Sequence, residues 1–210
     1  MKLFGNLIYG TFLKQTFVFA LALFMFGGTG CNYARSLPRT AASEESKNIP
    51  WKTSIVSENE KGEPLVITGR ILAPDGRTPL EGMTLYVYQT DAGGVYTTSG
   101  GDNRGTRIHG VMRTGSDGRY EFRTIRPGSY PGSRQPQHIH AYLSGPGYPE
   151  YWIDEYHFAD DPFISADLRQ QYGGKGNLSS LLTLTRDADG VWRGTRDIVA
   201  EGCSRNCTGR

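Results

Sequence analysis

Short β-like segments separated by turn signals dominate the chain after residue 65. Three Asp-Gly pairs, beginning at Asp75, Asp117 and Asp189, punctuate these segments, and this dipeptide is a strong signal for a tight turn between strands. No long apolar stripe with the period of a helix appears after the first 30 residues. Strands are predicted at residues 65–72, 84–89, 119–124, 138–143, 151–158, 181–185 and 191–196. With 28 glycines, the pattern predicts an all-β protein, a β-sandwich of short and mostly antiparallel strands with long loops.

The first 30 residues have the composition of an export signal. Two lysines flank short apolar stretches, and residues 17–26 form an uninterrupted apolar run. This run is too short to span a bilayer comfortably, so a cleaved signal peptide is predicted over residues 1–30, with a retained anchor as the alternative. Cys31 follows small residues as in a bacterial lipobox, although Gly28 stands where leucine is usual. We therefore expect an exported lipoprotein, anchored on the periplasmic or cell-surface side of a membrane through Cys31, with plain secretion as the alternative.

The remaining chain divides by composition into a tether, a domain and a tail. Residues 31–60 are polar and poor in apolar side chains, which predicts a tether between the membrane and the domain. The domain is expected over residues 61–200, followed by a C-terminal tail at residues 201–210. This tail holds Cys203 and Cys207, which an exported compartment allows to pair as a disulfide. Two free thiols are the alternative.

The charge balance argues against a nucleic-acid partner. The formal net charge is +2, but two of the 23 basic residues are lysines of the leader, which leaves 21 basic and 21 acidic residues. The mature protein is thus formally neutral, and its basic residues form no stripe. The sequence does not define an oligomeric state.

Two tyrosines and two histidines follow each other in an order that suggests a metal site. His138 and His140 are separated by one residue, and because side chains alternate across a strand, both imidazoles are expected on the same face. Tyr96 and Tyr130 lie upstream and can bring two phenols to the same ion. A phenol has a pKa of about 10, so a tyrosinate at neutral pH needs a strong local cation, which a bound metal supplies. Such oxygen donors suit trivalent iron.

The surroundings of these four residues resemble a known family. The stretches at residues 85–96, 117–131 and 137–140, with Gly93-Gly94-Val95-Tyr96 and Gln137-His-Ile-His140, are similar to the intradiol ring-cleavage dioxygenases. Within that family they look most like the protocatechuate 3,4-dioxygenase type. The resemblance extends from about residue 65 to about residue 164 and includes four ligand residues in the family's order.

This resemblance implies a function and a set of site residues. Tyr96, Tyr130, His138 and His140 would bind one non-haem Fe(III), with Tyr130 as the catalytic ligand that a catechol-type substrate displaces. The expected reaction opens the ring between its two hydroxylated carbons with O2 and yields a muconate-type diacid.

Three positions depart from the family pattern. Tyr88 stands where tryptophan is usual, Gln135 where an active-site arginine is expected, and Glu155 near where a glutamine is expected. All three are predicted to contact substrate, and Gln135 is also predicted to take part in catalysis. Residues 97–110 are glycine-rich and polar, and are expected to form a loop across the mouth of the site.

Two alternative functions remain open at this point. The departures at Gln135 and Glu155 also suit a secreted β-sandwich binding module or an inactive dioxygenase homologue. A zinc hydrolase could use His138 and His140 with either His109 or His157, because three histidines with one open position suit zinc catalysis. The zinc hypothesis leaves the two tyrosines without a role.

Overall fold

The computed structural model describes residues 48–98 and 103–201. The predicted signal peptide, the lipidation site at Cys31 and the predicted disulfide between Cys203 and Cys207 lie outside the described residues. Across the described ranges, no helix has the length and apolar character needed to cross a membrane.

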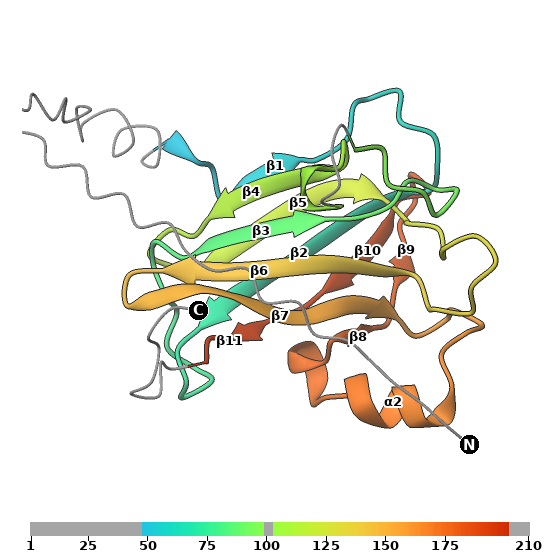
Figure 1. Ribbon diagram of the computed structural model, residues 1–210. Helices are drawn as coiled ribbons and strands as arrows, with labels where there is room; N and C mark the ends of the chain where they lie inside the picture. Colours follow the sequence, from blue (N-terminus) through green and yellow to red (C-terminus); the bar gives the residue numbers. More distant parts are fainter. Residues whose placement is uncertain (1–47, 99–102, 202–210) are drawn as a thin grey trace, which may run out of the picture. The chain divides into compact units, whose positions relative to one another are not determined.

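The described residues form two β-sheets, shown in Figure 1. The first sheet has the order β1 (Lys52–Ser54), β5 (Arg119–Ile125), β2 (Pro64–Leu72), β10 (Trp192–Thr195) and β9 (Thr185–Arg186), and β11 (Ile198–Val199) also pairs with β2. The second sheet has the order β4 (His109–Arg113), β3 (Thr84–Tyr88), β6 (His138–Gly145), β7 (Tyr148–Phe158) and β8 (Leu181–Leu182). The predicted all-β sandwich is confirmed.

Inward-facing side chains of both sheets share one hydrophobic core. Ile67 on β2 and Phe122 on β5 are fully buried in the same cluster as Leu85 on β3 and Ile139 on β6. Side-chain alternation along β6 explains how this strand can also carry chemistry. Its odd-numbered residues enter the core, so His138 and its even-numbered neighbours occupy the opposite face.

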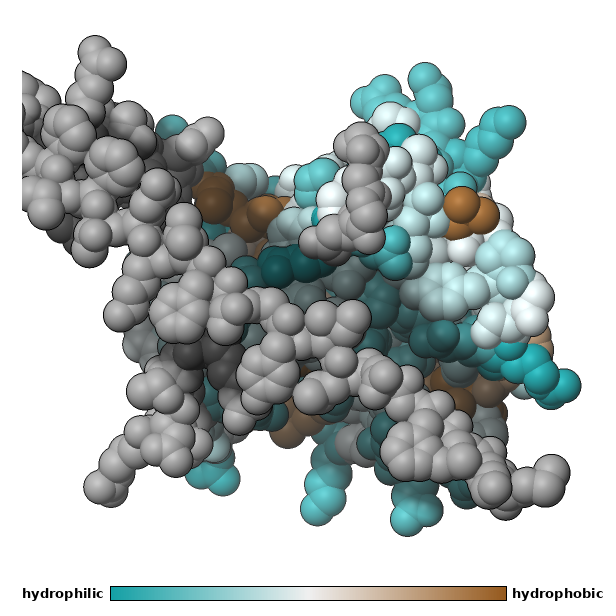
Figure 2. Space-filling model, in the orientation of Figure 1, coloured by the Kyte–Doolittle hydropathy of each residue, from teal (hydrophilic) through white to brown (hydrophobic). Residues whose placement is uncertain are grey.

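On the face shown in Figure 2, the described surface is mainly hydrophilic with small hydrophobic patches.

The Asp-Gly turns form as predicted. All three glycines have positive φ angles, 67° at Gly76, 70° at Gly118 and 78° at Gly190, and this backbone conformation carries little penalty for glycine. At the first turn, the Asp75 carboxylate accepts hydrogen bonds from the backbone N–H groups of Arg77 and Thr78, at 2.8 and 2.9 Å. These contacts are the usual reason why aspartate precedes glycine in turns.

Several elements differ from the sequence expectation. Strand β1 lies inside the predicted tether but pairs in parallel with β5, with Lys52 opposite Glu121 and their Nζ and Oε1 atoms 2.7 Å apart. The predicted strand at residues 181–185 is split into β8 and β9. Strand β4 begins at His109, inside the predicted loop, and earlier in that loop lies the 3-10 turn η2 (Asn103–Gly105).

A helix was also missed. Helix α2 (Ala166–Tyr172) has no buried residue, so it carries no apolar stripe for a periodicity argument to detect. Its start is nevertheless encoded locally, because Ser165 Oγ accepts a hydrogen bond from the N–H of Leu168 at 3.2 Å. A second 3-10 turn, η3 (Gly176–Leu178), leads from α2 to β8.

Candidate metal centre

Four side chains that the sequence pattern predicted as a set converge at one end of β6. Tyr96 lies on the loop after β3, Tyr130 lies on the loop after β5, and His138 and His140 lie at the start of β6. The Tyr130 hydroxyl oxygen is 2.9 Å from the Tyr96 hydroxyl oxygen, 3.2 Å from His138 Nε2 and 3.4 Å from His140 Nε2. The two Nε2 atoms are 3.2 Å apart. Two oxygen and two nitrogen atoms thus point at one small volume.

Backbone contacts hold the two tyrosine loops together. Gly94 has a φ of 79°, and a Cβ there would lie 1.9 Å from the carbonyl oxygen of Ser129. The N–H of Gly128 donates to the carbonyl of Asp91 at 2.9 Å, and the Asp91 carboxylate accepts from the N–H of Val95 at 3.0 Å. These contacts place the loop that carries Tyr96 directly on the loop that carries Tyr130.

The orientation of His138 is set through its other ring nitrogen. Its Nδ1 lies 2.7 Å from the carbonyl oxygen of Pro136, which only accepts hydrogen bonds, so Nδ1 carries the proton. Burial lowers the pKa of His138, which favours the neutral imidazole. The Nε2 atom therefore presents a lone pair to the centre.

His140 is enclosed by three side chains. The ring of Tyr88 stacks on it with centroids 4.6 Å apart, and the edge of Trp152 approaches to a centroid distance of 4.9 Å. Glu155 Oε1 lies 3.5 Å from His140 Nδ1. A carboxylate at that position favours a proton on Nδ1, so the Nε2 atom of His140 also presents a lone pair.

This arrangement of donors fits a cation. The two phenol groups supply one proton each, and the Tyr96–Tyr130 contact uses one of them. The other phenol proton can be donated to the Nε2 atom of His138 or to that of His140, but not to both. One of the two imidazole lone pairs is therefore left without a donor, although the two Nε2 atoms are close together. A metal ion replaces both protons and satisfies all four atoms. The four residues therefore fit the ferric ion that the resemblance implies.

The protein surroundings of Tyr96 by themselves oppose tyrosinate formation. Burial, followed by the hydrogen bond with Tyr130, raises the pKa of Tyr96 well above its ordinary value. A multivalent cation inverts this balance, because it stabilises the phenolate directly. Tyr96 would therefore lose its proton when such a cation binds.

A network behind the site positions the residues just before β6. The Arg126 guanidinium pairs with both carboxylate oxygens of Asp160, at 2.7 and 2.8 Å, and donates to the side chain of Gln137 at 2.7 Å. The backbone N–H of Gln137 donates to Asp161 at 2.7 Å. The loop that enters β6 is therefore tied to the turn that follows β7. No sequence motif indicated this network, because its members are ordinary charged residues far apart in the chain.

The structure contradicts the zinc alternative. Within the described ranges, no group of three or more His, Cys, Asp or Glu side chains is arranged to hold a metal. His109 Nδ1 lies 2.6 Å from the carbonyl oxygen of Thr106, and the His157 ring stacks on Tyr172 with centroids 3.9 Å apart. Burial lowers the pKa of His157 to about 4. His109 is held by this local contact and His157 by ring packing, although the buried Nδ1 of His157 has no hydrogen-bond partner in the described part of the chain.

The residues predicted to contact substrate occupy different environments. Tyr88 is only 5% exposed and packs against His140. Gln135 is exposed on the loop before β6, and its backbone N–H donates to Ser133 Oγ at 3.0 Å. Glu155 is partly buried and faces His140. Trp152 was not anticipated as a site residue, although it is 41% exposed and lies against His140.

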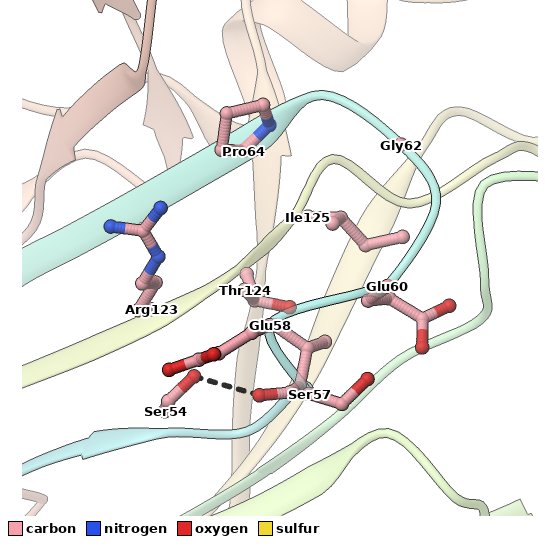
Figure 3. A pocket seen from close by; sticks show the side chains of 10 residues that line it. Ser54, Ser57, Glu58, Glu60, Gly62, Pro64, Arg123, Thr124 and Ile125 are labelled. Atoms are coloured by element: carbon pink, nitrogen blue, oxygen red, sulfur yellow. Dashed lines mark hydrogen bonds between the residues drawn. The ribbon is translucent and has the colours of Figure 1, made fainter. Parts of the chain in front are cut away.

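A cavity of about 630 Å³ beside β5 is separate from this chemistry. Figure 3 shows its charged lining residues Glu58, Glu60 and Arg123, and the lining contains no histidine, cysteine or tyrosine. Glu60 is already paired with Arg107, whose Nη2 atom lies 3.0 Å from Glu60 Oε1. The cavity therefore adds nothing to the four-donor site.

Known proteins resemble this chain in both sequence and fold. A family model described as Dioxygenase matches residues 38–199. The chain is 29% identical over 160 residues to 6-chlorohydroxyquinol 1,2-dioxygenase of Cupriavidus pinatubonensis, covering 69% of this chain and 56% of the relative. It is 30% identical over 127 residues to the protocatechuate 3,4-dioxygenase beta chain of Burkholderia cepacia, covering 55% and 53%.

A solved dioxygenase structure is also similar to this chain. The dioxygenase domain of a dioxygenase carbohydrate-binding protein fusion from the cellulolytic bacterium Streptomyces sp. SirexAA-E superposes with a TM-score of 0.55 at 30% identity. The match covers 74% of this chain and 91% of that one. The chain belongs to the intradiol dioxygenase family. It spans just over half the length of the two curated relatives described above.

Proposed function

We propose that this chain is a non-haem Fe(III) intradiol dioxygenase that cleaves a catechol-type ring between its two hydroxylated carbons. One observation carries the proposal, namely that the Tyr130 hydroxyl lies 2.9 to 3.4 Å from the other three donor atoms. Relatives named for hydroxyquinol and protocatechuate substrates support a substrate with adjacent hydroxyl groups.

Each of the four candidate ligands has a distinct role in this reaction. Ferric iron, when bound, supplies a Lewis acid for the two oxygen atoms of a catechol. His138 and His140 would hold the ion as neutral donors, and Tyr96 would hold it as an anionic donor. Tyr130 would be the second anionic donor, and its hydroxyl oxygen would be the atom that takes up a proton from the substrate. Both atoms of O2 enter the product, so the ring C–C bond between the hydroxylated carbons is replaced by two carboxyl groups.

The test measures iron and oxygen together. The purified full-length chain, kept in detergent, is expected to bind one ferric ion with a broad visible absorption band and to consume one O2 per catechol, hydroxyquinol or protocatechuate converted. His138→Ala should abolish iron binding. Tyr130→Phe should retain iron and lose most turnover. His109→Ala, outside the four-donor set, should match the wild type.

Two results would contradict the proposed function in different ways. A colourless protein that holds zinc, with only the histidines needed for binding, would remove the ferric site. Stoichiometric iron without oxygen uptake on any of these diols would instead favour the inactive homologue or binding module.

We also propose that the protein is exported and anchored by a lipid on Cys31, with Cys203 bridged to Cys207. The apolar run at residues 17–26 and the small residues before Cys31 support export, and that compartment permits the disulfide. Mass spectrometry of the native protein checks both points. A retained Met1 would refute lipidation, and two alkylatable thiols in the non-reduced tail would refute the bridge.

A further inference from the structure

We propose that Glu155 is a positioning residue, whose carboxylate accepts a hydrogen bond from His140 Nδ1 and makes His140 a stronger metal donor than His138. This inference depends on the proposed function, because it takes a ferric ion on the Nε2 atoms as given. It also changes the role expected for Glu155 from contact with substrate to contact with a ligand.

An irregularity in strand β7 produces the contact. Ile139 pairs with Tyr156 and Ala141 pairs with Ile153, so two residues of β7 stand opposite the single residue His140. Such a β-bulge is often found beside active sites, where it changes the direction of a side chain. The two residues in the bulge are Asp154 and Glu155.

The bulge explains why two residues that are three positions apart reach the same imidazole. In a regular strand, Trp152 and Glu155 would point to opposite faces of the sheet. Here the Trp152 ring lies 4.9 Å from the His140 ring between centroids, and Glu155 Oε1 lies 3.5 Å from His140 Nδ1. The extra residue returns Glu155 to the face that holds the metal centre.

The Nδ1 atom of His140 needs this partner. It is buried and, within the described part of the chain, has no hydrogen-bond partner, while Glu155 Oε1 lies 3.5 Å away. The equivalent atom of His138 is already satisfied by the carbonyl of Pro136 at 2.7 Å. Metal-ligating histidines almost always donate their second N–H to a carboxylate, a carbonyl or water. Glu155 is placed to accept from His140.

The charge of the acceptor distinguishes the two histidines. Pro136 offers His138 a neutral carbonyl, whereas Glu155 offers His140 an anion. A carboxylate partner raises the basicity of an imidazole ligand. The glutamine that the family pattern expects near this position would lack this negative charge.

The test compares Glu155→Gln, which keeps the shape and removes the charge, with Glu155→Ala in the iron-loaded full-length protein. Glu155→Gln should move the tyrosinate-to-iron band to longer wavelength and raise the midpoint potential of the iron. Glu155→Ala should also weaken iron binding by about 10- to 100-fold in a chelator competition. Glu150→Gln is the matched control, because Glu150 lies on the same strand and pairs with Arg104 at 3.0 Å. It should change none of these values.

The possible failures are distinguishable. An unchanged band, potential and iron affinity in both Glu155 variants, with KM for the catechol increased, would overturn the positioning role in favour of substrate contact. A wild-type protein without the visible band would overturn the proposed function and this inference with it. If Glu155→Ala does not fold, the band and potential of Glu155→Gln still decide the question.

Discussion

The backbone of Gly94 lies directly against the carbonyl group of Ser129, at a distance that leaves no room for a side chain. A Cβ on Gly94 would be 1.9 Å from that oxygen, and the residue also has a φ of 79°. Through this contact, the loop that carries Tyr96 is held against the loop that carries Tyr130, and the two hydroxyl groups come within 2.9 Å. This close backbone approach is therefore one of the contacts that bring two of the four donors together.

Gly94→Ala should therefore damage both stability and metal binding. We expect the free energy of unfolding to fall by more than about 2 kcal/mol, since positive φ costs a residue with a side chain about 1–2 kcal/mol and overpacking adds about 1–3 kcal/mol. Urea denaturation measures the first effect, and the iron content of the purified protein measures the second. Both should decrease.

Gly147→Ala is the matched control for this substitution. Gly147 has a similar φ of 81°, but a Cβ there would meet nothing within 4 Å. This variant should lose only the conformational term of about 1–2 kcal/mol and keep its full complement of iron. Equal iron loss in the two variants would show that the contact between Gly94 and Ser129 does not organise the site.

Two consecutive hydrogen bonds between buried groups give a prediction about which of two tyrosines contributes more to stability. The Tyr156 hydroxyl donates to the Tyr120 hydroxyl at 3.1 Å, which in turn donates to the carbonyl of Arg196 at 2.6 Å. Tyr120→Phe removes a partner from two buried groups and should cost about 1–3 kcal/mol. Tyr156→Phe leaves the bond to Arg196 intact and should cost only about 0.5–1.5 kcal/mol. Chemical denaturation in urea measures both, and the reverse order would refute this direction of donation.

The ion pair behind the site gives a prediction for pH. Hydrogen bonds from Arg126 are the main cause that lowers the pKa of Asp160 in the folded protein. The pair therefore stabilises the fold fully above the ordinary carboxyl pKa of about 4, and this contribution is lost as the pH falls through the lower folded value. Because Asp160 is half exposed, Asp160→Asn should cost no more than about 1 kcal/mol at neutral pH. The difference in the free energy of unfolding between the wild type and Asp160→Asn should become smaller in strong acid. A difference that stays constant in urea unfolding curves recorded over this pH range would show that the ion pair with Arg126 is not its cause.

The sequence predicted the features that repeat locally. Alternating apolar residues located most of the core strands, and the Asp-Gly pairs marked three turns that the structure contains. The order of two tyrosines before a His-x-His pair identified a set of side chains that do converge. In each case the signal lies within one short segment, where the period of a strand or the backbone of a turn constrains the residue type.

The features that the sequence did not predict depend on distant contacts. Strand β1 lies in a polar segment and is defined by pairing with β5, more than 60 residues away. Helix α2 has no apolar face. The bulge opposite His140 becomes visible only when the registers of β6 and β7 are compared, so the sequence alone assigned Glu155 to the substrate. Register between strands and side-chain networks are three-dimensional properties.

The last prediction concerns Gln135, which stands where the family pattern expects an arginine. An arginine there could stabilise the negative charge that develops on the ring as O2 attacks, whereas a neutral amide offers a weaker hydrogen bond. Gln135 is exposed on the loop before β6, so a longer side chain can be accommodated without disturbing the core. We expect Gln135→Arg to raise kcat/KM for protocatechuate, by as much as about 10- to 100-fold, at unchanged iron content.

Arg134 already carries a guanidinium next to this position, but it cannot substitute for the missing arginine. Its guanidinium lies over the ring of Phe163, 5.6 Å from the centroid, and neighbouring residues on an extended segment point in opposite directions. Arg134→Gln should therefore leave kcat/KM nearly unchanged and serves as the control. Steady-state kinetics on a panel of substituted catechols measure all three proteins. If the wild type is already fast on protocatechuate and Gln135→Arg only slows it, the site does not lack a cation, and the amide of Gln135 is suited to its own substrate.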